Sequence, residues 1–454
     1  MLRKFISKLA KNKRGNVLVL TSLTAPIFIG FAGLSIDVGY GFYSKSKLRG
    51  ATELTALDIA EKYTVPNNPS FAEAKNLDRN PMITDALSIS QGGLPNNHKN
   101  VAIKREDVEI GEWDVESQVF TPVGSGPIVN AARVKGEMSD ERNNKISTFF
   151  GKMFGFSPDL HSQAMAIAPL IPGIHLLNPT AAGALRHSNG TDTDSTDLDV
   201  GDIWINSDAP NALIASQSGW TFGATGAYIK GGATLPDDNF HEDLFRLPDL
   251  LATQPEPARP WLRTQCDYRD LVINTLDPVT LSPGTYCGGL NIIQSSSVTF
   301  SPGLHQFLDG PLLIAASPRV FGRDVLLHFD GPGAGITVRG GSNVYFSGLT
   351  TGINKGLVIF SSRDTTGGIT HNFIGSRAEF VGTYYAPDNR IVITNSNIDG
   401  KCHSLCLVAD TMAVTNGSFL NWYHGFGSLT FFNGDTRVAP TALEPYLSPY
   451  LISS

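Results

Sequence analysis

The densest set of oxygen ligands in the sequence is the stretch NGTDTDSTDLDVGD, residues 189–202. Carboxylates at alternate positions can bind Ca²⁺, but this stretch lacks the EF-hand order that ends in glutamate. We favour a second interpretation, in which the charges keep a strand edge solvated and prevent association between sheets. We therefore predict no metal site and no cofactor. The five carboxylates belong to Asp192, Asp194, Asp197, Asp199 and Asp202.

The acidic residues of the C-terminal half do not suggest glycan chemistry. A glycoside hydrolase needs two carboxylates close together, and a lyase needs carboxylates around Ca²⁺ with a basic residue that accepts a proton. No acidic pair recurs at a fixed offset with a flanking His or Arg. We expect His305 in a turn or on an outer face, and Arg363, Asp364 and His371 in a loop without a catalytic role. The sequence therefore predicts that the chain is not an enzyme. The acids are Asp277, Asp309, Asp324, Asp330, Asp364, Glu379, Asp388, Asp399 and Asp410.

The four cysteines, Cys266, Cys287, Cys402 and Cys406, all follow residue 265. An even number confined to one half favours two disulfides formed in an oxidising compartment. Free thiols and a zinc site are the alternatives, and zinc is disfavoured because no second ligand pair follows Cys402-His403-Ser404-Leu405-Cys406. A Cys266–Cys287 bond would close a loop of about twenty residues and contribute roughly 3 kcal/mol.

Composition indicates a β-rich chain of two or three domains. The 454 residues exceed the size of one ordinary domain. Only 17% of residues are charged, while Gly, Ser, Thr and Asn are plentiful, which is typical of an extracytoplasmic protein. The net charge of −7 and the lack of a basic patch argue against a nucleic-acid partner.

Repeats organise the C-terminal half. VTLSPGTY at 279–286 and VTFSPGLH at 298–305 are related, and short apolar strands separated by Gly, Asn, Ser and Asp fill residues 180–430. A period near twenty residues predicts a parallel β-helix, a right-handed solenoid, over 171–430. A β-sandwich is the alternative, but the hairpin signals that it needs are not systematic. We expect a protruding loop, or a helix on the outer face, at 235–260, and a tail at 431–454.

The N-terminus combines a cationic tail with a long uncharged run. Six basic residues precede the run, which extends over 16–36 and ends at Asp37. Its length is sufficient to span the hydrocarbon of a bilayer, and exceeds the apolar core of a secretory signal. The positive-inside rule predicts a cytoplasmic tail at 1–15, a single transmembrane helix at 16–36 and a periplasmic body. A cleaved signal peptide, with a weak site at 32–35, and a buried core helix are the alternatives.

The helix is expected to continue beyond the membrane. Leu48, Thr52, Thr55 and Ile59 follow helical spacing, with Ala51, Leu54 and Ala56 nearby, and Pro66 and Pro69 then end the helix. This stripe is expected to pack on the chain's own next domain, and a partner helix is the alternative. Mixed helix and strand patterns up to residue 170 predict a small α+β module over 37–170 without a catalytic constellation.

The N-terminal pattern resembles a known family. Arg14, Gly15 and Asn16, then the apolar span, then residues 32–39 with Asp37 and Gly39, lead into an Ala-rich helix. This order resembles TadG-like proteins of tight-adherence (Tad/Flp) pilus assembly, as do SPGTYCGG at 282–289 and LVADTMAVTNGSF at 407–419. A prepilin signal would have Glu where this chain has Leu20, which favours retention in the membrane.

The resemblance implies a structural or assembly role in the inner membrane and periplasm. The implied partners are the inner membrane and pilus-assembly or envelope proteins. A membrane-tethered β-helix that binds or acts on carbohydrate, with glycan as its partner, is the contrasting class.

Overall fold

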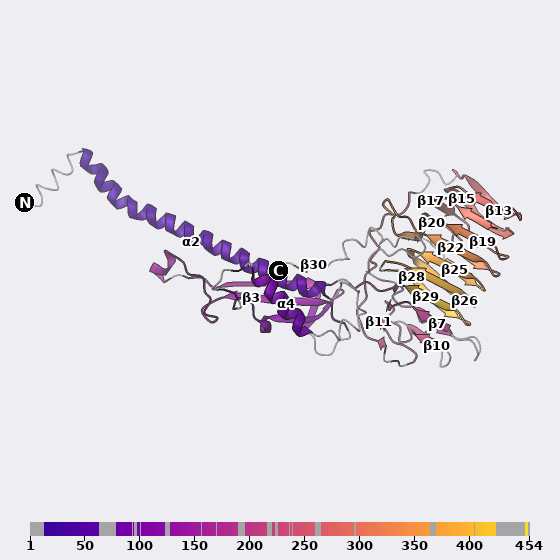
Figure 1. Ribbon diagram of the computed structural model, residues 1–454, viewed down its shortest axis with the longest axis horizontal. Coiled ribbons are helices and arrows are strands. Elements are labelled where there is room, and N and C mark those ends of the chain that lie inside the picture. Colours follow the sequence, from indigo (N-terminus) through magenta and orange to yellow (C-terminus); the bar gives the residue numbers. More distant parts are fainter. Residues whose placement is uncertain are drawn as a thin grey trace, which may run out of the picture.

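The computed structural model describes residues 13–62, 79–92, 94, 98–99, 101–122, 128–155, 157–168, 170–188, 196–215, 220–222, 226–235, 237, 239–258, 265–294, 297–363, 369–403, 405–423 and 450–452. Within them the chain is mainly β, with large parallel sheets and one apolar helix at the N-terminal end. Figure 1 shows this helix projecting from a small mixed module, with the stacked strands at the opposite end of the molecule.

The N-terminal helix α2 extends unbroken over Lys13–Glu61, through Pro26. Its 49 residues make it about 74 Å long at the usual rise per residue. The expected continuation of the span into a second helical segment is therefore confirmed. The first part of α2 projects free, and the second part lies on the module (Figure 1).

The module is an antiparallel sheet covered by helices. Its strand order is β2-β1-β3-β4-β30, and α2 packs on β3 and β4 beside a second helix, α4. Residues Tyr450–Ile452, in the stretch expected to be a tail, form β30 and pair with β4 at the sheet edge. The elements are α4 Arg79–Gln91, η1 Arg105–Asp107, η2 Gly151–Phe154, β1 Val108–Asp114, β2 Val119–Pro122, β3 Ala131–Met138, β4 Leu160–Ile167 and β30 Tyr450–Ile452.

The remaining described strands form a body of parallel pairs that enclose one apolar core. Some strands alternate buried and exposed positions, as Arg319–Gly322 does, which suits a sheet with one face in the core, whereas others, such as Val325–Asp330, are buried throughout. Long strands bend between two rows: β26 pairs with β23 in its first half and with β24 in its second. In-register partners are commonly about twenty residues apart, as with Val298 and Val320.

A nine-stranded sheet has the order β10-β7-β29-β27-β25-β22-β19-β16-β14. Its strands are β7 Thr196–Asp199, β10 Trp220–Phe222, β14 Val279–Leu281, β16 Ser297–Phe300, β19 Arg319–Gly322, β22 Asn343–Ser347, β25 Arg377–Val381, β27 Asn397–Lys401 and β29 Phe419–Tyr423. The sixteen-stranded sheet contains β5 Ile174–Leu176, β6 Leu185–Ser188, β8 Asp202–Ile205, β9 Leu213–Ala215, β11 Gly226–Ile229, β12 Phe240–His241, β13 Tyr268–Asn274, β15 Gly284–Gln294, β17 Gly303–Leu308, β18 Leu312–Ile314, β20 Val325–Asp330, β21 Ile336–Arg339, β23 Leu357–Ser361, β24 Thr370–Ile374, β26 Thr383–Thr394 and β28 Leu407–Thr415.

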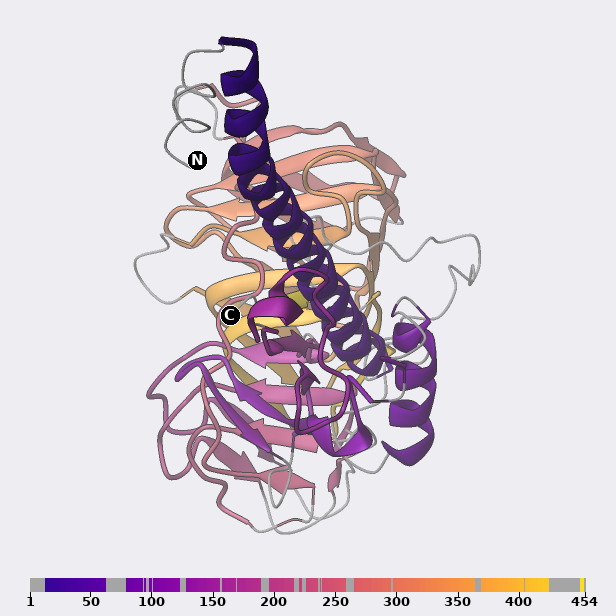
Figure 2. The ribbon, with the colours of Figure 1, turned by 90° about the vertical axis from the view of Figure 1, so that its left-hand side faces the viewer.

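The chain enters this stack in its middle. Strand β5 pairs on one side with β8 and on the other with β28, which lies more than 230 residues later in the sequence. The chain therefore builds from β5 to one end at β12, crosses to the other end at β13, and returns to meet its own beginning. In Figure 2 the yellow strands near residues 407–423 accordingly lie between the orange and the pink strands.

The segment that makes this crossing, residues 243–258, is here called the strap. Its described residues are irregular, as expected for a loop, but they form no helix and their large apolar side chains lie buried, so the expected protrusion and the expected outer helix are both wrong there. Its apolar side chains Leu244, Phe245, Leu247, Leu250 and Leu251 are buried against the outer face of the sixteen-stranded sheet. The repeats are interrupted because a connection across the whole stack cannot itself form part of a layer.

Candidate functional site

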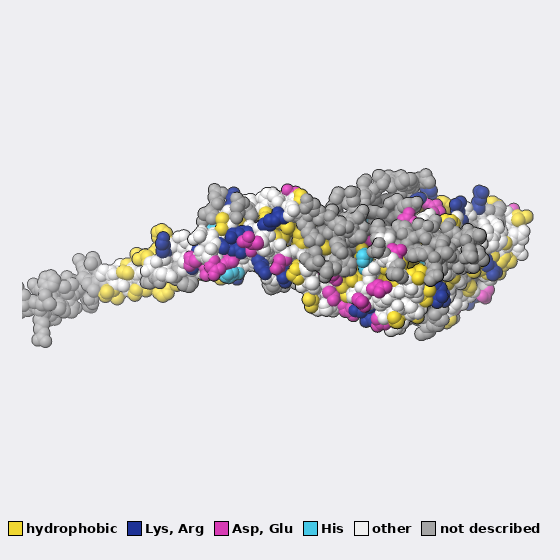
Figure 3. Space-filling model, turned by 90° about the horizontal axis from the view of Figure 1, so that it is seen from below, with side chains coloured by type: hydrophobic (Ala, Val, Ile, Leu, Met, Phe, Trp, Pro, Cys, Tyr) yellow, Lys and Arg dark blue, Asp and Glu magenta, His cyan; other side chains and the backbone are white. Residues whose placement is uncertain are grey.

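The first part of α2 has the surface of a membrane span. By length and composition it is the one helix, among the described residues, that could cross a membrane, although an N-terminal signal sequence has the same properties. Phe28 and Leu23 are 71% and 66% exposed. The hydroxyls of Thr24 and Ser35 donate to the carbonyl oxygens of Leu20 and Phe31, as polar groups must do in hydrocarbon. Figure 3 shows yellow side chains along this projecting part.

Asp37, which ends the uncharged run, binds the module directly. Its carboxylate accepts hydrogen bonds from the backbone N–H groups of Phe149, Phe150 and Gly151 at 2.6, 2.7 and 2.6 Å. Only 6% of Asp37 is exposed. Three charge-assisted hydrogen bonds from one loop satisfy a carboxylate that would otherwise be costly to bury. The segment 146–155 is thereby held against the last turn of the uncharged run.

One turn earlier, Gly33 permits the same contact. A Cβ atom at Gly33 would overlap the ring of Phe150, so a larger residue would displace the loop. Gly39 makes no comparable contact, because nothing lies within 4 Å of its added Cβ. Asp37 thus has a clear structural role among the family-pattern residues. Arg14, Gly15 and Asn16 belong to the first turns of α2, and their side chains lie outside the described residues.

The second part of α2 belongs to the core of the module. Leu48, Thr52, Thr55 and Ile59 are fully buried, as the helical spacing predicted, whereas Leu54 is 45% exposed. Gly136 of β3 lets the helix approach closely, since an added Cβ would lie 2.6 Å from Thr52 Cγ2. The stripe therefore packs on the chain's own sheet, as expected.

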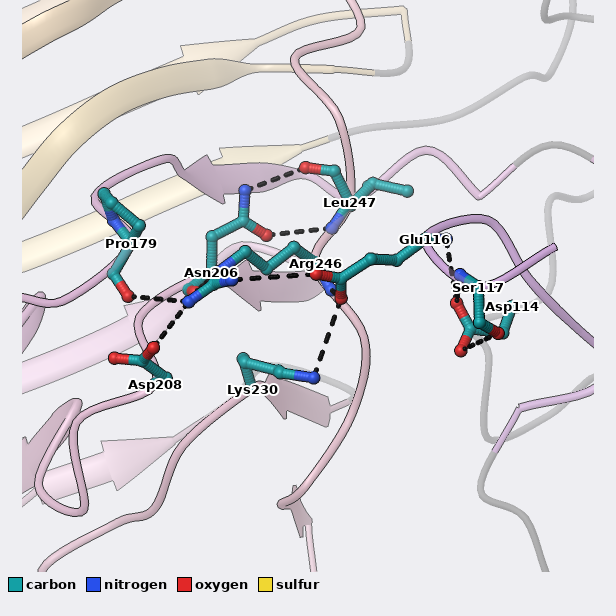
Figure 4. A network of polar contacts seen from close by, with 9 residues as sticks. All are labelled: Asp114, Glu116, Ser117, Pro179, Asn206, Asp208, Lys230, Arg246 and Leu247. Atoms are coloured by element: carbon teal, nitrogen blue, oxygen red, sulfur yellow. Dashed lines mark hydrogen bonds and ion pairs between the residues drawn. The ribbon is translucent and has the colours of Figure 1, made fainter. Parts of the chain in front are cut away.

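A polar network joins the module to the body (Figure 4). Glu116, in the β1–β2 turn, accepts a hydrogen bond from the backbone N–H of Arg246 at 3.0 Å and lies 3.6 Å from both the Lys230 ammonium and the Arg246 guanidinium. The Arg246 N–H and these two cations lower the pKa of Glu116. Arg246 also forms a 2.6 Å ion pair with Asp208 of the body. The turn is thus bound to the first residues of the strap.

The strap is held along its length by further polar contacts. Asn206 and Leu247 exchange two hydrogen bonds at 2.8 and 2.9 Å. Arg363 donates to the carbonyl oxygens of Leu251 and Gln254 at 2.7 and 3.0 Å. Tyr385 donates to Asp249 at 2.6 Å. The strap is therefore an integral part of the body.

The structure shows where the histidines and the arginine that were considered as catalytic candidates lie. His371 is fully buried in β24, so its expected place in a loop is wrong. It contacts Tyr384, Ser361 and Asn389 at 2.5, 3.2 and 3.1 Å, and burial lowers its pKa to about 3. Arg363 is instead bound to the strap, and Asp364 lies outside the described residues. His305 is also fully buried, in β17, so its expected place in a turn or on an outer face is wrong.

Sequence reasoning missed one acidic pair. Glu379 of β25 and Asp399 of β27 are in direct register on neighbouring parallel strands, with Tyr345 next in the same row. Lys401 forms a 2.7 Å ion pair with Glu379. The offset of twenty residues, close to the repeat, was the available signal. The search was restricted to pairs with a flanking His or Arg, and this restriction left the Glu379–Asp399 pair out.

Of the five candidate calcium ligands, Asp199 and Asp202 have described side chains. Asp192 and Asp194 lie outside the described residues, as do the side chains up to Asp197. Within the described part of the chain, no group of three His, Cys, Asp or Glu side chains could hold a metal ion.

All four cysteines are paired in disulfides. Cys266 bonds Cys287 and Cys402 bonds Cys406, with Cα–Cα distances of 5.8 and 5.2 Å. The first fastens the segment after the strap to β15, and the second closes a tight loop before β28. The prediction of two disulfides is thus confirmed.

No protein-family model matches the chain, and no curated protein or solved structure does so either.

Proposed function

We propose that this chain is a membrane-anchored structural component, in which α2 remains in the inner membrane and holds a rigid body in the periplasm. The observation that carries the proposal is the continuity of α2. One half exposes an uncharged apolar surface, and the other half is buried in a folded module. A rigid helix of this kind would hold the body, and any partner bound to it, at a fixed distance from the membrane.

Retention is favoured over cleavage by the contacts at the end of the span. Cleavage at 32–35 would separate the apolar run from a helix whose Gly33 and Asp37 bind the 146–155 segment. Proteolytic cleavage favours exposed loop segments. Here the candidate site is helical and Gly33 lies against Phe150.

The body suits a parallel β-helix, the form that we propose for residues 171–430. Its strands pair in parallel, and long bent strands such as β26 pass from one row to another. Right-handed crossovers prevail between parallel strands, so we propose the right-handed form. Such a body is stiff and presents long rows of outward polar side chains.

The resemblance of residues 14–39 to TadG-like proteins leads us to propose a role in assembling or anchoring a tight-adherence pilus or a related secretion machinery. The partners would be pilus-assembly or envelope proteins, with no catalysis by the chain. Scaffolding needs only an anchor, a spacer and a rigid face, and each has a counterpart in this chain.

The anchor is tested by fractionation of cells that produce the full chain. We expect the protein to resist carbonate extraction and to begin upstream of residue 16. A soluble species that begins near residue 36 would contradict retention.

The scaffold role is tested by replacing residues 171–423 with a short Gly/Ser linker, which keeps α2, the module and β30. We expect the shortened protein to stay in the membrane while surface pili and adherence are lost. Normal pili combined with loss of glycan binding would instead favour the second candidate.

That second candidate is a carbohydrate-binding or carbohydrate-active body, and the Glu379–Asp399 pair is the observation that favours it. Carboxylates in register beside an aromatic residue are suited to hydrogen-bonding sugar hydroxyls. Retention of the full chain on immobilised glycans, compared with a Glu379→Gln/Asp399→Asn variant, tests it. Binding that is absent in both proteins would exclude this site.

A further inference from the structure

The segment 146–155 carries large apolar side chains that the module does not cover. Phe149 and Met153 are 77% and 78% exposed, more than the apolar side chains of the span itself. The Phe149 ring packs edge-on against Phe150, and Phe150 is the residue that contacts Gly33. The exposed pair is thus fixed in place by its neighbours, since the backbone of 149–151 is bound to Asp37.

The level of this segment along α2 is defined by those contacts. Gly33 and Asp37 bracket the last turn of the uncharged run, where a spanning helix leaves the hydrocarbon. Aromatic and aliphatic side chains at that depth are stable in the interfacial layer of a bilayer. Phe42, 72% exposed on the next turns of α2, continues the same apolar surface.

The charges beside this surface match an anionic lipid layer. Lys152 lies between Phe149 and Met153 in sequence and is exposed, and Lys45 and Lys47 follow on α2. Of the carboxylates near this level, Asp37 accepts hydrogen bonds from three backbone N–H groups, and Asp159, between the cavity-lining Pro158 and Leu160, forms a 3.3 Å ion pair with Lys145. Cations next to exposed apolar residues at a membrane boundary bind the headgroups while the apolar groups enter the layer.

A cavity between the segment and α2 has the same character. It has a volume of about 230 Å³, and its wall is mainly apolar, with Leu34, Val38, Phe42 and Leu160 beside the charged residues Asp37 and Lys45. Apolar cavities bind apolar groups more readily than water. Methylene groups of an acyl chain fit this lining.

We propose that residues 149–153 form a second membrane contact, in which Phe149 and Met153 enter the lipid interface and Lys152 binds anionic headgroups. This inference rests on the proposed retention of α2 as an anchor. Two contacts at one level fix the tilt and rotation of α2, which a single helix leaves free. The module and the body would then have a defined orientation relative to the membrane.

The experiment uses the full chain, reconstituted in phosphatidylcholine vesicles with and without phosphatidylglycerol. A Met153→Cys variant is labelled with an environment-sensitive dye. The four native cysteines are all in disulfides and leave the new thiol as the reactive one. Lipids spin-labelled near the ester end of the acyl chain serve as quenchers. Val119→Cys, at a 53% exposed site on β2, is the solvent control, and Phe28→Cys is the control for the span.

We expect quenching at position 153 to exceed that at position 119 by about twofold or more, because interfacial groups lie within a few ångströms of that label. Phosphatidylglycerol should increase the difference, and a Lys152→Gln change should remove the increase. Quenching at 153 equal to that at 119 would overturn the proposal. So would a blue-shifted but unquenched dye, which indicates that a second copy of the chain covers the segment.

The span control separates this proposal from the one on which it rests. If Phe28→Cys is quenched and Met153→Cys is not, the anchor stands and the second contact fails. If neither is quenched, the anchor itself is wrong.

Discussion

The two parts of α2 belong to one unbroken helix but differ in what surrounds them. Around Phe28 the side chains point outward on all sides, whereas Leu48 and its neighbours are buried against β3 and β4. The first part is apolar all round, as a helix in lipid must be, and the second has a buried stripe and an exposed polar face. In the proposed arrangement the helix leaves the membrane near Asp37, where the backbone of residues 149–151 binds it.

The largest expected effect concerns a charge in the first part. Phe28→Arg places a cation at the centre of the span and should disfavour membrane insertion by about 3.5 kcal/mol. Leu54→Arg, on the exposed face of the second part, should leave insertion unchanged. Carbonate extraction and fractionation measure both. Equal partitioning of the two variants would mean that the two parts do not differ in solvent.

A substitution that creates a cavity in the second part of α2 should have nearly as large an effect, here on the free energy of unfolding. Leu48 is fully buried, so Leu48→Ala should lower the free energy of unfolding by about 3 kcal/mol. Leu23→Ala, at a 66% exposed site in the first part, should change it by less than about 0.5 kcal/mol in detergent. Chemical denaturation of the full chain in detergent measures both. A similar loss for both variants would place the first part in a protein core.

The boundary between the parts can be tested with two glycines. Gly33→Leu should overlap Phe150 and lower the unfolding free energy by about 2 kcal/mol. Gly39→Leu meets open space and should be neutral or slightly stabilising, since leucine favours a helix by about 0.8 kcal/mol over glycine. Thermal unfolding in detergent compares the two. If Gly33→Leu proves neutral, the 146–155 segment does not dock there.

The smallest effect concerns the polar face of the second part. Arg49 and Glu53 form an exposed i,i+4 ion pair at 2.6 Å. Glu53→Gln should cost about 0.4 kcal/mol at low salt, and the cost should disappear at high salt if this face lies in water. Denaturation at two ionic strengths gives the comparison. A cost that salt does not alter would indicate a face shielded from solvent.

Sequence patterns predicted correctly those features that depend on a single helix or strand. The apolar N-terminal helix, its continuation and the buried stripe from Leu48 to Ile59 follow from hydrophobic spacing alone. Leu54 was expected near the buried stripe but is 45% exposed. Hydrophobic spacing defines the centre of the buried stripe, whereas the number of residues buried on either side depends on how closely β3 and β4 approach the helix. The alternation and the twenty-residue repeat likewise predicted parallel strands.

Contacts between segments far apart in the chain could not be predicted from the sequence pattern. Nothing in residues 146–155 indicates that their backbone will bind Asp37, more than 100 residues earlier. The strap resembles a loop in composition, and its burial depends on an outer sheet face that exists only after the layers stack. His305 was misplaced because a single residue in a strand gives no indication of which face is covered.

By itself the sequence determined the elements of this protein: an uncharged run long enough for a membrane, a helix beyond it, short repeated strands, and two pairs of cysteines. Tertiary structure alone decided their order in space. The first strand β5 meets the last layers at β28, so the stack closes on its own beginning. The register of the strands placed Glu379 beside Asp399, and the Asp37 contact placed Phe149 at the end of the uncharged run. Hydrophobic spacing is a property of neighbours in the chain, whereas these arrangements depend on surfaces that form only when distant segments pack together.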